Sequence, residues 1–144
     1  MGTSGITHFH ESDFASPVIC HVYKQSDGYP DSLGEQIKAC FGNANLVNGI
    51  RFDLENQVNG MGCAASQFIA YVKQGVGGVY MLREAPRWSD YDYHVFHDEA
   101  IPGPGGTPAK LRMTVMSGAD VIWSGDIKDF DAETLYPDED DEAS

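Results

Sequence analysis

The chain has 144 residues, 42% hydrophobic and 22% charged, which is the composition of a folded protein with one sizeable core. Nine basic residues against 22 acidic ones give a net charge of −13. This balance excludes a conventional nucleic-acid-binding protein, because such proteins neutralise phosphates with Lys and Arg. No apolar run suits a membrane span and residues 1–5 do not resemble a signal peptide, so we expect a cytoplasmic protein of a host cell, away from membranes.

Acidic residues gather at the C-terminus, where residues 125–144 hold nine of them beside the single basic residue Lys128. We therefore expect one domain over residues 1–136 and a solvated acidic tail over residues 137–144. One alternative for the tail is that its carboxylates imitate phosphate spacing and dock on a basic partner, and another is adaptation to a high-salt cytoplasm. The three cysteines, Cys20, Cys40 and Cys63, are widely spaced and lie among apolar residues, which favours free thiols in a reducing compartment.

Two strands are predicted at the N-terminus, over residues 5–10 and 17–25, because both segments alternate and are rich in β-branched and aromatic residues. If these strands pair, His21 can reach His8 and His10, which share one face by alternation. Three histidines could bind a metal, but no acidic pattern supports such a site, and we expect none. His94 and His97 are three apart in a later strand and so face opposite sides.

Two helices are predicted next. Ser32 and Glu35 match a capping box, and an apolar stripe of Leu33, Ile37 and Phe41 predicts a helix over residues 32–41. Residues 42–60 are rich in Asn and predict a long loop, with a possible short strand over 49–54. A second apolar stripe (Ala65, Phe68, Ile69 and Val72) predicts a helix over residues 62–73.

The rest of the chain predicts β-structure. Strands are expected over residues 76–84, 91–98, 109–116 and 121–124, with a Pro- and Gly-rich loop over 101–108. In the third of these strands, Leu111, Met113 and Val115 should face inward. We expect consecutive strands to be linked as hairpins, including those over 76–84 and 91–98. The order of elements then predicts an α+β fold, with a mostly antiparallel sheet of five to six strands and two helices on one face.

Two glycine-containing segments are the main candidates for a site. Asn59-Gly60-Met61-Gly62 precedes a helix, where free N–H groups attract anions and glycines let a ligand approach the backbone. The segment from Gln25 to Pro30 combines a carboxylate, an amide and an aromatic ring. Because each precedes a helix, we expect the two to converge on one pocket. The ligand-binding residues predicted on this basis are Gln25, Asp27, Tyr29, Asn48, Asn59, Gly60, Gly62 and Gln67. Both segments could instead be folding turns that require a positive φ angle.

A third glycine segment, Gly75-Val76-Gly77-Gly78, marks a bulge or a surface that a ligand can approach closely. Catalytic signatures such as G-x-S-x-G and H-E-x-x-H do not occur. Cys63, in the first turn of the second predicted helix, is a conceivable nucleophile with no partner to support it. The sequence therefore favours a protein without enzymatic activity and implies no cofactor.

Five segments resemble motifs of a family of short proteins from bacteriophages, prophages and their bacterial hosts. They are Gly2-Thr3, Tyr23 to Pro30 (Tyr-x-Gln-x-Asp-Gly-Tyr-Pro), Val47 to Ile50 (Val-Asn-Gly-Ile), Asn59 to Gln67 (Asn-Gly-Met-Gly-Cys-x-Ala-x-Gln) and Gly75 to Tyr80 (Gly-Val-Gly-Gly-x-Tyr). The usual Tyr before the Asp-Gly-Tyr-Pro turn is Ser26 here. The resemblance covers residues 2–82 and implies a phage or prophage accessory protein, without supplying a mechanism.

Two functions follow as hypotheses. The first is a small acidic accessory protein that binds a host protein, such as a component of a defence system, and inhibits or modulates it. The second is a module that binds a small molecule or a nucleotide-like signal through the Asp-Gly-Tyr-Pro turn and the glycine-rich start of the second helix.

Overall fold

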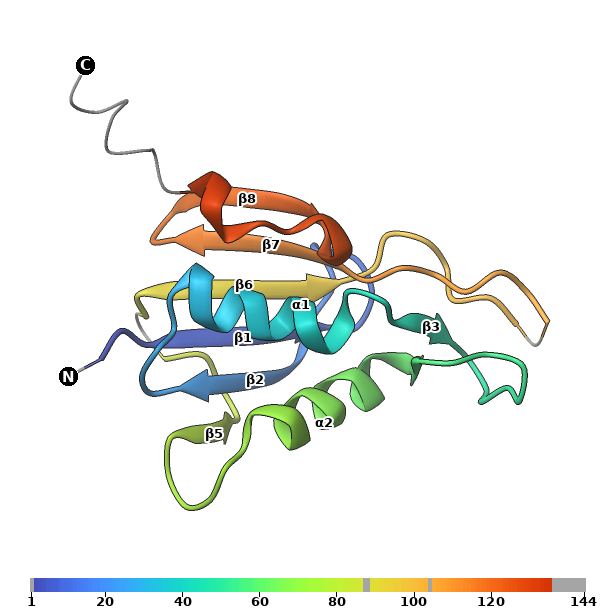
Figure 1. Ribbon diagram of the computed structural model, residues 1–144, viewed down its shortest axis with the longest axis horizontal. Helices are drawn as coiled ribbons and strands as arrows, with labels where there is room; N and C mark the ends of the chain where they lie inside the picture. The colour runs from blue at the N-terminus through green and yellow to red at the C-terminus, as the bar shows by residue number, and fades with distance from the viewer. Residues whose placement is uncertain (1, 87–88, 104, 136–144) are drawn as a thin grey trace.

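The computed structural model describes residues 2–86, 89–103 and 105–135. It has an α+β fold, in which one mostly antiparallel six-stranded sheet is covered on one face by two helices (Figure 1). The strands lie in the order β5-β2-β1-β6-β7-β8. Their bounds are β1 (Gly5–His10), β2 (Val18–Lys24), β5 (Val79–Leu82), β6 (Tyr91–Phe96), β7 (Arg112–Ser117) and β8 (Asp120–Asp126). The predicted fold class is confirmed.

The N-terminal hairpin is also confirmed, because β1 and β2 pair antiparallel with Thr7 opposite Val22. One expectation about the sheet is wrong. The strands predicted over residues 76–84 and 91–98 are consecutive in the chain but are not neighbours, since β2 and β1 lie between β5 and β6. β1 and β6 pair in parallel, so the chain crosses the sheet between β5 and β6 instead of turning back as a hairpin.

The first helix begins earlier than predicted. Pro30–Gly34 form one turn of π-helix, and α1 (Glu35–Phe41) follows it directly. The amides of Ser32 and Leu33 both donate to the carbonyl of Tyr29, and neither helical segment has a side-chain cap. The capping box is therefore wrong: Pro30, whose fixed φ suits the first helical position, starts the segment two residues ahead of Ser32.

The second helix, α2 (Gly60–Val72), also begins two residues earlier than predicted. Its buried side includes Met61 and Ala64 as well as the predicted Phe68 and Val72. The aromatic rings of Phe68 and Phe41 meet Phe9 of β1, with ring centroids 5.8 and 6.0 Å from that of Phe9. These contacts place the core between the helices and the sheet, where the inward-facing residues of β7 are buried as predicted.

The segment between the helices differs from the prediction. The possible strand over residues 49–54 is absent, and two shorter strands flank that region instead. They are β3 (Asn45–Val47) and β4 (Gln57–Asn59), which pair in parallel as a separate two-stranded sheet. Residues 48–56 form a loop held by the side chain of Gln57 in β4, which accepts the amide of Arg51 at 2.7 Å and donates to the carbonyls of Arg51 and Leu54.

The three cysteines are free and half-buried, and all three pack against the core, as the sequence predicts. Burial raises the pKa of the Cys40 thiol to about 11, so this thiol is a poor nucleophile. Over the described ranges, no helix has both the length and the apolar character needed to cross a membrane.

Candidate functional site

The segment Gln25 to Pro30 forms a tight turn held against the start of β1. The amide of Gly28 donates to the carbonyl of Thr3 at 2.8 Å, and the carbonyl of Gly28 accepts the hydroxyl of Tyr93 at 2.6 Å. Asp27, next to it, has a φ of 58°, which is uncommon for a residue other than glycine. The turn therefore keeps Asp27 in an unfavourable conformation at the surface, and backbone strain of this kind is concentrated at functional sites.

This turn meets the third glycine segment, Gly75–Gly78, which connects α2 to β5. The amide of Gln25 donates to the carbonyl of Gly78 at 2.8 Å, and the rings of Tyr23 and Tyr80 stack with centroids 6.3 Å apart. A polar pocket of about 350 Å³ lies between the two segments. Its lining residues are Lys24, Ser26, Asp27, Ser32, Gln36, Val72, Gln74, Gly75, Val76, Gly77, Gly78 and Val79. We call this the turn–loop pocket.

The turn–loop pocket contains an unsatisfied acceptor. Gln36, from α1, lines it, and its side-chain oxygen Oε1 is buried without a hydrogen-bond partner. Buried polar atoms of folded proteins are nearly always paired, so an orphaned acceptor beside a pocket is notable. The pocket also holds a positive charge. The ammonium group of Lys24 donates to the backbone carbonyl of Ser26 at 2.8 Å and is not neutralised by a carboxylate.

The other predicted segment lies at the opposite end of α2. Asn59 and Gly60 are at the start of this 13-residue helix, whereas Val72, which lines the turn–loop pocket, is its last residue. At ~1.5 Å per residue these ends are about 20 Å apart. The prediction that the two segments share one pocket is wrong, because α1 and α2 run in opposite directions and their N-termini point apart (Figure 1).

The start of α2 contacts the Val-Asn-Gly-Ile segment, residues 47–50. Asn59 pairs with Val47 between β4 and β3, and its side-chain oxygen accepts the amide of Gly49 at 2.8 Å. The Val-Asn-Gly-Ile segment, which includes the exposed Asn48, therefore adjoins the glycine-rich start of α2. Gln67 donates to the carbonyl of Gln57 at 3.3 Å. The five motif segments thus fall into two groups, one at each end of α2.

Of the eight predicted ligand-binding residues, only Asp27 lines the turn–loop pocket. Gln25 is exposed beside it, and its backbone holds the two segments together. Tyr29 is 44% exposed and packs against Tyr91, with ring centroids 6.4 Å apart. Asn48, Asn59, Gly60, Gly62 and Gln67 belong to the far end.

A second polar cluster lies on the sheet face opposite the helices. Three strands bring His21, His8 and His94 side by side, since His8 pairs with His21 on one side and with His94 on the other. The rings of His8 and His94 stack with centroids 4.5 Å apart. His10 joins them, with its Nε2 atom 2.7 Å from Nδ1 of His94, and the ring of Phe14 lies against both.

Hydrogen bonds fix the tautomers of these rings in the neutral state. The Asp92 carboxylate accepts from Nε2 of His8 at 2.7 Å, so Nδ1 of His8 is left to accept from Nδ1 of His21 at 2.8 Å. The carbonyl of Ser16 likewise accepts from Nδ1 of His10 at 3.0 Å, so His94 must donate its Nδ1 proton to His10. Both chains of hydrogen bonds are therefore complete with every histidine ring neutral.

Burial opposes charge on this cluster. It lowers the pKa of His94 to about 3, assisted by the nearby rings of His8 and His10, and it also lowers the pKa values of His10 and His21. Burial works against ionisation of Asp92 as well, but hydrogen bonds from His8 and Ser89 outweigh it and lower the pKa of this carboxyl.

Alternation predicted that His8 and His10 share a face and that His21 can reach them if the first two strands pair; β1 and β2 do pair, and His21 contacts His8. Alternation did not predict that His94 and Asp92 join the cluster, because their position beside His8 depends on the β1–β6 pairing. In the part of the chain that the structure describes, no three His, Cys, Asp or Glu side chains are arranged to hold a metal ion.

Comparisons with protein-family models, with curated proteins and with solved structures find no match to this chain.

Proposed function

We propose that this protein is a binding module whose ligand is a small polar molecule held in the turn–loop pocket. The observation that carries the proposal is the pocket itself, which joins two glycine-containing segments from distant parts of the chain. Its volume of about 350 Å³ falls within the range of small-molecule sites. The strained Asp27 and the unpaired Oε1 atom of Gln36 add the polar groups that would orient a ligand.

The experiment is a thermal-shift panel of nucleotides, cyclic nucleotides, amines and sugars on the full chain. A bound ligand stabilises the folded state by RT ln(1 + [L]/Kd), which is about 2.7 kcal/mol at a hundredfold excess over Kd. Gln74→Trp, which fills the pocket, should abolish any shift. Gln67→Trp, at an exposed position of α2 outside the pocket, is the matched control and should retain it. A panel without shifts, or shifts that survive Gln74→Trp, would refute the proposal.

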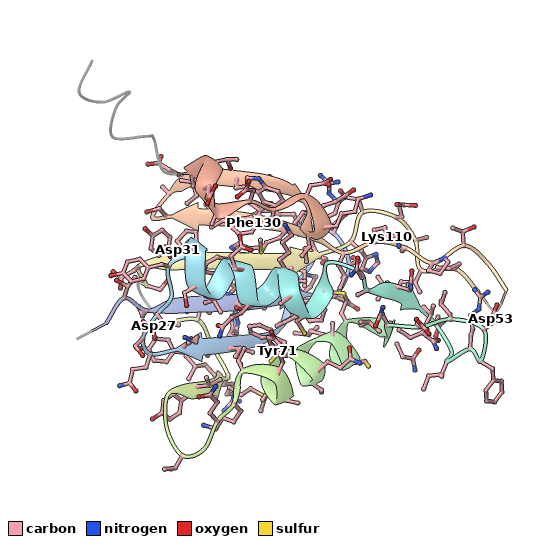
Figure 2. The ribbon with its side chains drawn as sticks, viewed as in Figure 1. Asp27, Asp31, Asp53, Tyr71, Lys110 and Phe130 are labelled. Carbon is pink, nitrogen blue, oxygen red and sulfur yellow. The ribbon has the colours of Figure 1, made fainter. Side chains whose placement is uncertain are left out.

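A second candidate function is docking on a host protein, as expected of an acidic phage-type accessory protein. The loop over residues 48–56 favours it, because Phe52 and Ile50 are 109% and 77% exposed. Arg51 holds the loop, donating to the Asp53 carboxylate and, at 2.6 Å, to the carbonyl of Gly106. Figure 2 shows Asp53 at the opposite end of the molecule from Asp27. A pre-ordered loop with an exposed aromatic ring is suited to anchoring an interface.

Affinity capture from a bacterial host tests this candidate. Phe52→Ser should weaken retention of a specific partner by about tenfold or more, as expected for an interface anchor. Val121→Ser is the matched control, because Val121 is 57% exposed on β8 and lies outside the turn–loop pocket. Equal retention by both variants would exclude the 48–56 loop as the docking surface.

A further inference from the structure

We infer that the ligand of the turn–loop pocket carries a phosphate group, which the Gly75–Gly78 loop and Lys24 bind, as in a nucleotide or a sugar phosphate. This inference rests on the proposed function and names the chemistry of the ligand. It is drawn from the hydrogen bonds of the loop, from the charge beside it and from the polar groups across the pocket.

Two carbonyl groups of the loop are occupied, whereas its amides are free. The carbonyl of Gly78 accepts from the amide of Gln25, and the carbonyls of Gly77 and Val79 accept from the ammonium of Lys73 at 2.9 and 2.8 Å. The amides of Gly75 to Gly78, in contrast, donate to no group in the described residues. A short loop whose N–H groups have no internal partner can present the positive ends of its peptide dipoles to an anion, which is the basis of many anion sites.

Glycine makes this arrangement possible. Gly75, Gly77 and Gly78 have φ angles of +136°, +78° and +77°, which other residues rarely adopt. A Cβ atom built on Gly75 or Gly78 would meet no atom within 4 Å, so glycine is not needed here to avoid a clash. The backbone conformation therefore explains the glycines of the segment.

Positive charge gathers here in a strongly acidic chain. Lys24 lines the pocket and Lys73 braces the loop, so two of only nine basic residues serve one site. Asp27 is the one acidic residue of the lining. A carboxylate repels phosphate but accepts hydrogen bonds from hydroxyl and amino groups, and the Oε1 atom of Gln36 is also an acceptor. The ligand therefore combines an anionic group with hydrogen-bond donors, as a nucleotide or a sugar phosphate does.

The test measures binding of three probes to the full chain by calorimetry at constant ionic strength: adenosine monophosphate, inorganic pyrophosphate and adenosine. We expect both phosphate compounds to bind and adenosine to bind at least tenfold more weakly. Lys24→Gln should weaken phosphate binding by tenfold or more. Lys110→Gln should leave it unchanged, because Lys110 contacts Asn45, in the separate β3–β4 sheet.

Asp27→Asn tests the sign of the charge that the pocket prefers. Asparagine tolerates the left-handed φ of this position, so the turn should be preserved. Removing the carboxylate should leave phosphate binding equal or stronger, whereas a cationic ligand would bind more weakly. Failure of both phosphate compounds to bind, or binding that ignores Lys24→Gln, overturns the inference. If an amine or a neutral sugar then binds in a manner blocked by Gln74→Trp, the inference fails while the proposed function stands.

Discussion

Lowering the pH from 7 to 4.5 should destabilise the protein by about 2 kcal/mol through His94. Burial lowers the pKa of this ring from 6.5 to about 3 in the folded state. The unfolded chain therefore binds a proton as the pH falls below 6.5, while the folded chain binds it only near pH 3. Stability is fully present above pH 6.5 and is lost progressively as the pH falls toward the folded pKa. A pKa shift from 6.5 to about 3 corresponds to a loss of about 2.7 kcal/mol by pH 4.5, and we expect less because His94 is partly exposed to solvent.

The measurement is the free energy of unfolding in urea at several pH values between 7 and 4.5. His94→Asn is the informative variant, since its amide nitrogen can replace Nδ1 as the donor to His10 without adding a titrating group. Its stability should depend on pH less steeply than that of the wild type. His97→Asn is the control, because His97 contacts the carbonyl of Glu99, apart from the histidine cluster. Protonation of carboxylates also reduces charge repulsion in this acidic chain, and it does so in the wild type and in both variants. The quantity to compare is therefore the slope of the unfolding free energy against pH. Identical slopes for His94→Asn and the wild type would contradict the prediction.

Local patterns in the sequence predicted most of the sheet and both helices. Alternation over Leu111, Met113 and Val115 reports which side of a strand is buried, and it needs no knowledge of the neighbouring strand. Strand order is a different kind of information. The pairing of His8 with His94 joins residues far apart in the chain, and nothing local distinguishes a parallel neighbour from a hairpin partner. The histidine cluster was therefore only partly predictable.

The candidate site illustrates the same limit. The residue types of the two segments predicted Asp27 and Gly75–Gly78 as separate candidates for a site, because glycines and turn-forming residues are recognised from local sequence. Their meeting depends on the length and direction of α2, which returns the chain to the turn while carrying Gly60 to the opposite end. Gln36 carried no signal, because a glutamine on a helix is ordinarily solvated. Its buried, unpaired oxygen becomes visible only when the helix is packed.

The glycines of the two predicted turns should respond in opposite ways to substitution by alanine. Gly28→Ala should destabilise the protein by about 3 kcal/mol or more, because its Cβ atom would lie 2.4 Å from the backbone nitrogen of Gly5 and 2.4 Å from the carbonyl carbon of Ser4. These are backbone atoms at the start of β1, so the clash cannot be relieved by a side-chain rotation. Moving the turn away would also strain the hydrogen bonds that Gly28 makes with Thr3 and Tyr93.

Gly62→Ala, at the start of α2, is the matched control. Gly62 is exposed within α2, and a Cβ atom there would meet nothing within 4 Å. Alanine should therefore stabilise the helix by about 0.5–1 kcal/mol. Urea denaturation followed by circular dichroism measures both changes, and complete failure of Gly28→Ala to fold also agrees with the prediction. A Gly28→Ala protein as stable as Gly62→Ala would show that the turn can separate from β1, and the placement of Asp27 beside the Gly75–Gly78 loop would then lose its structural basis.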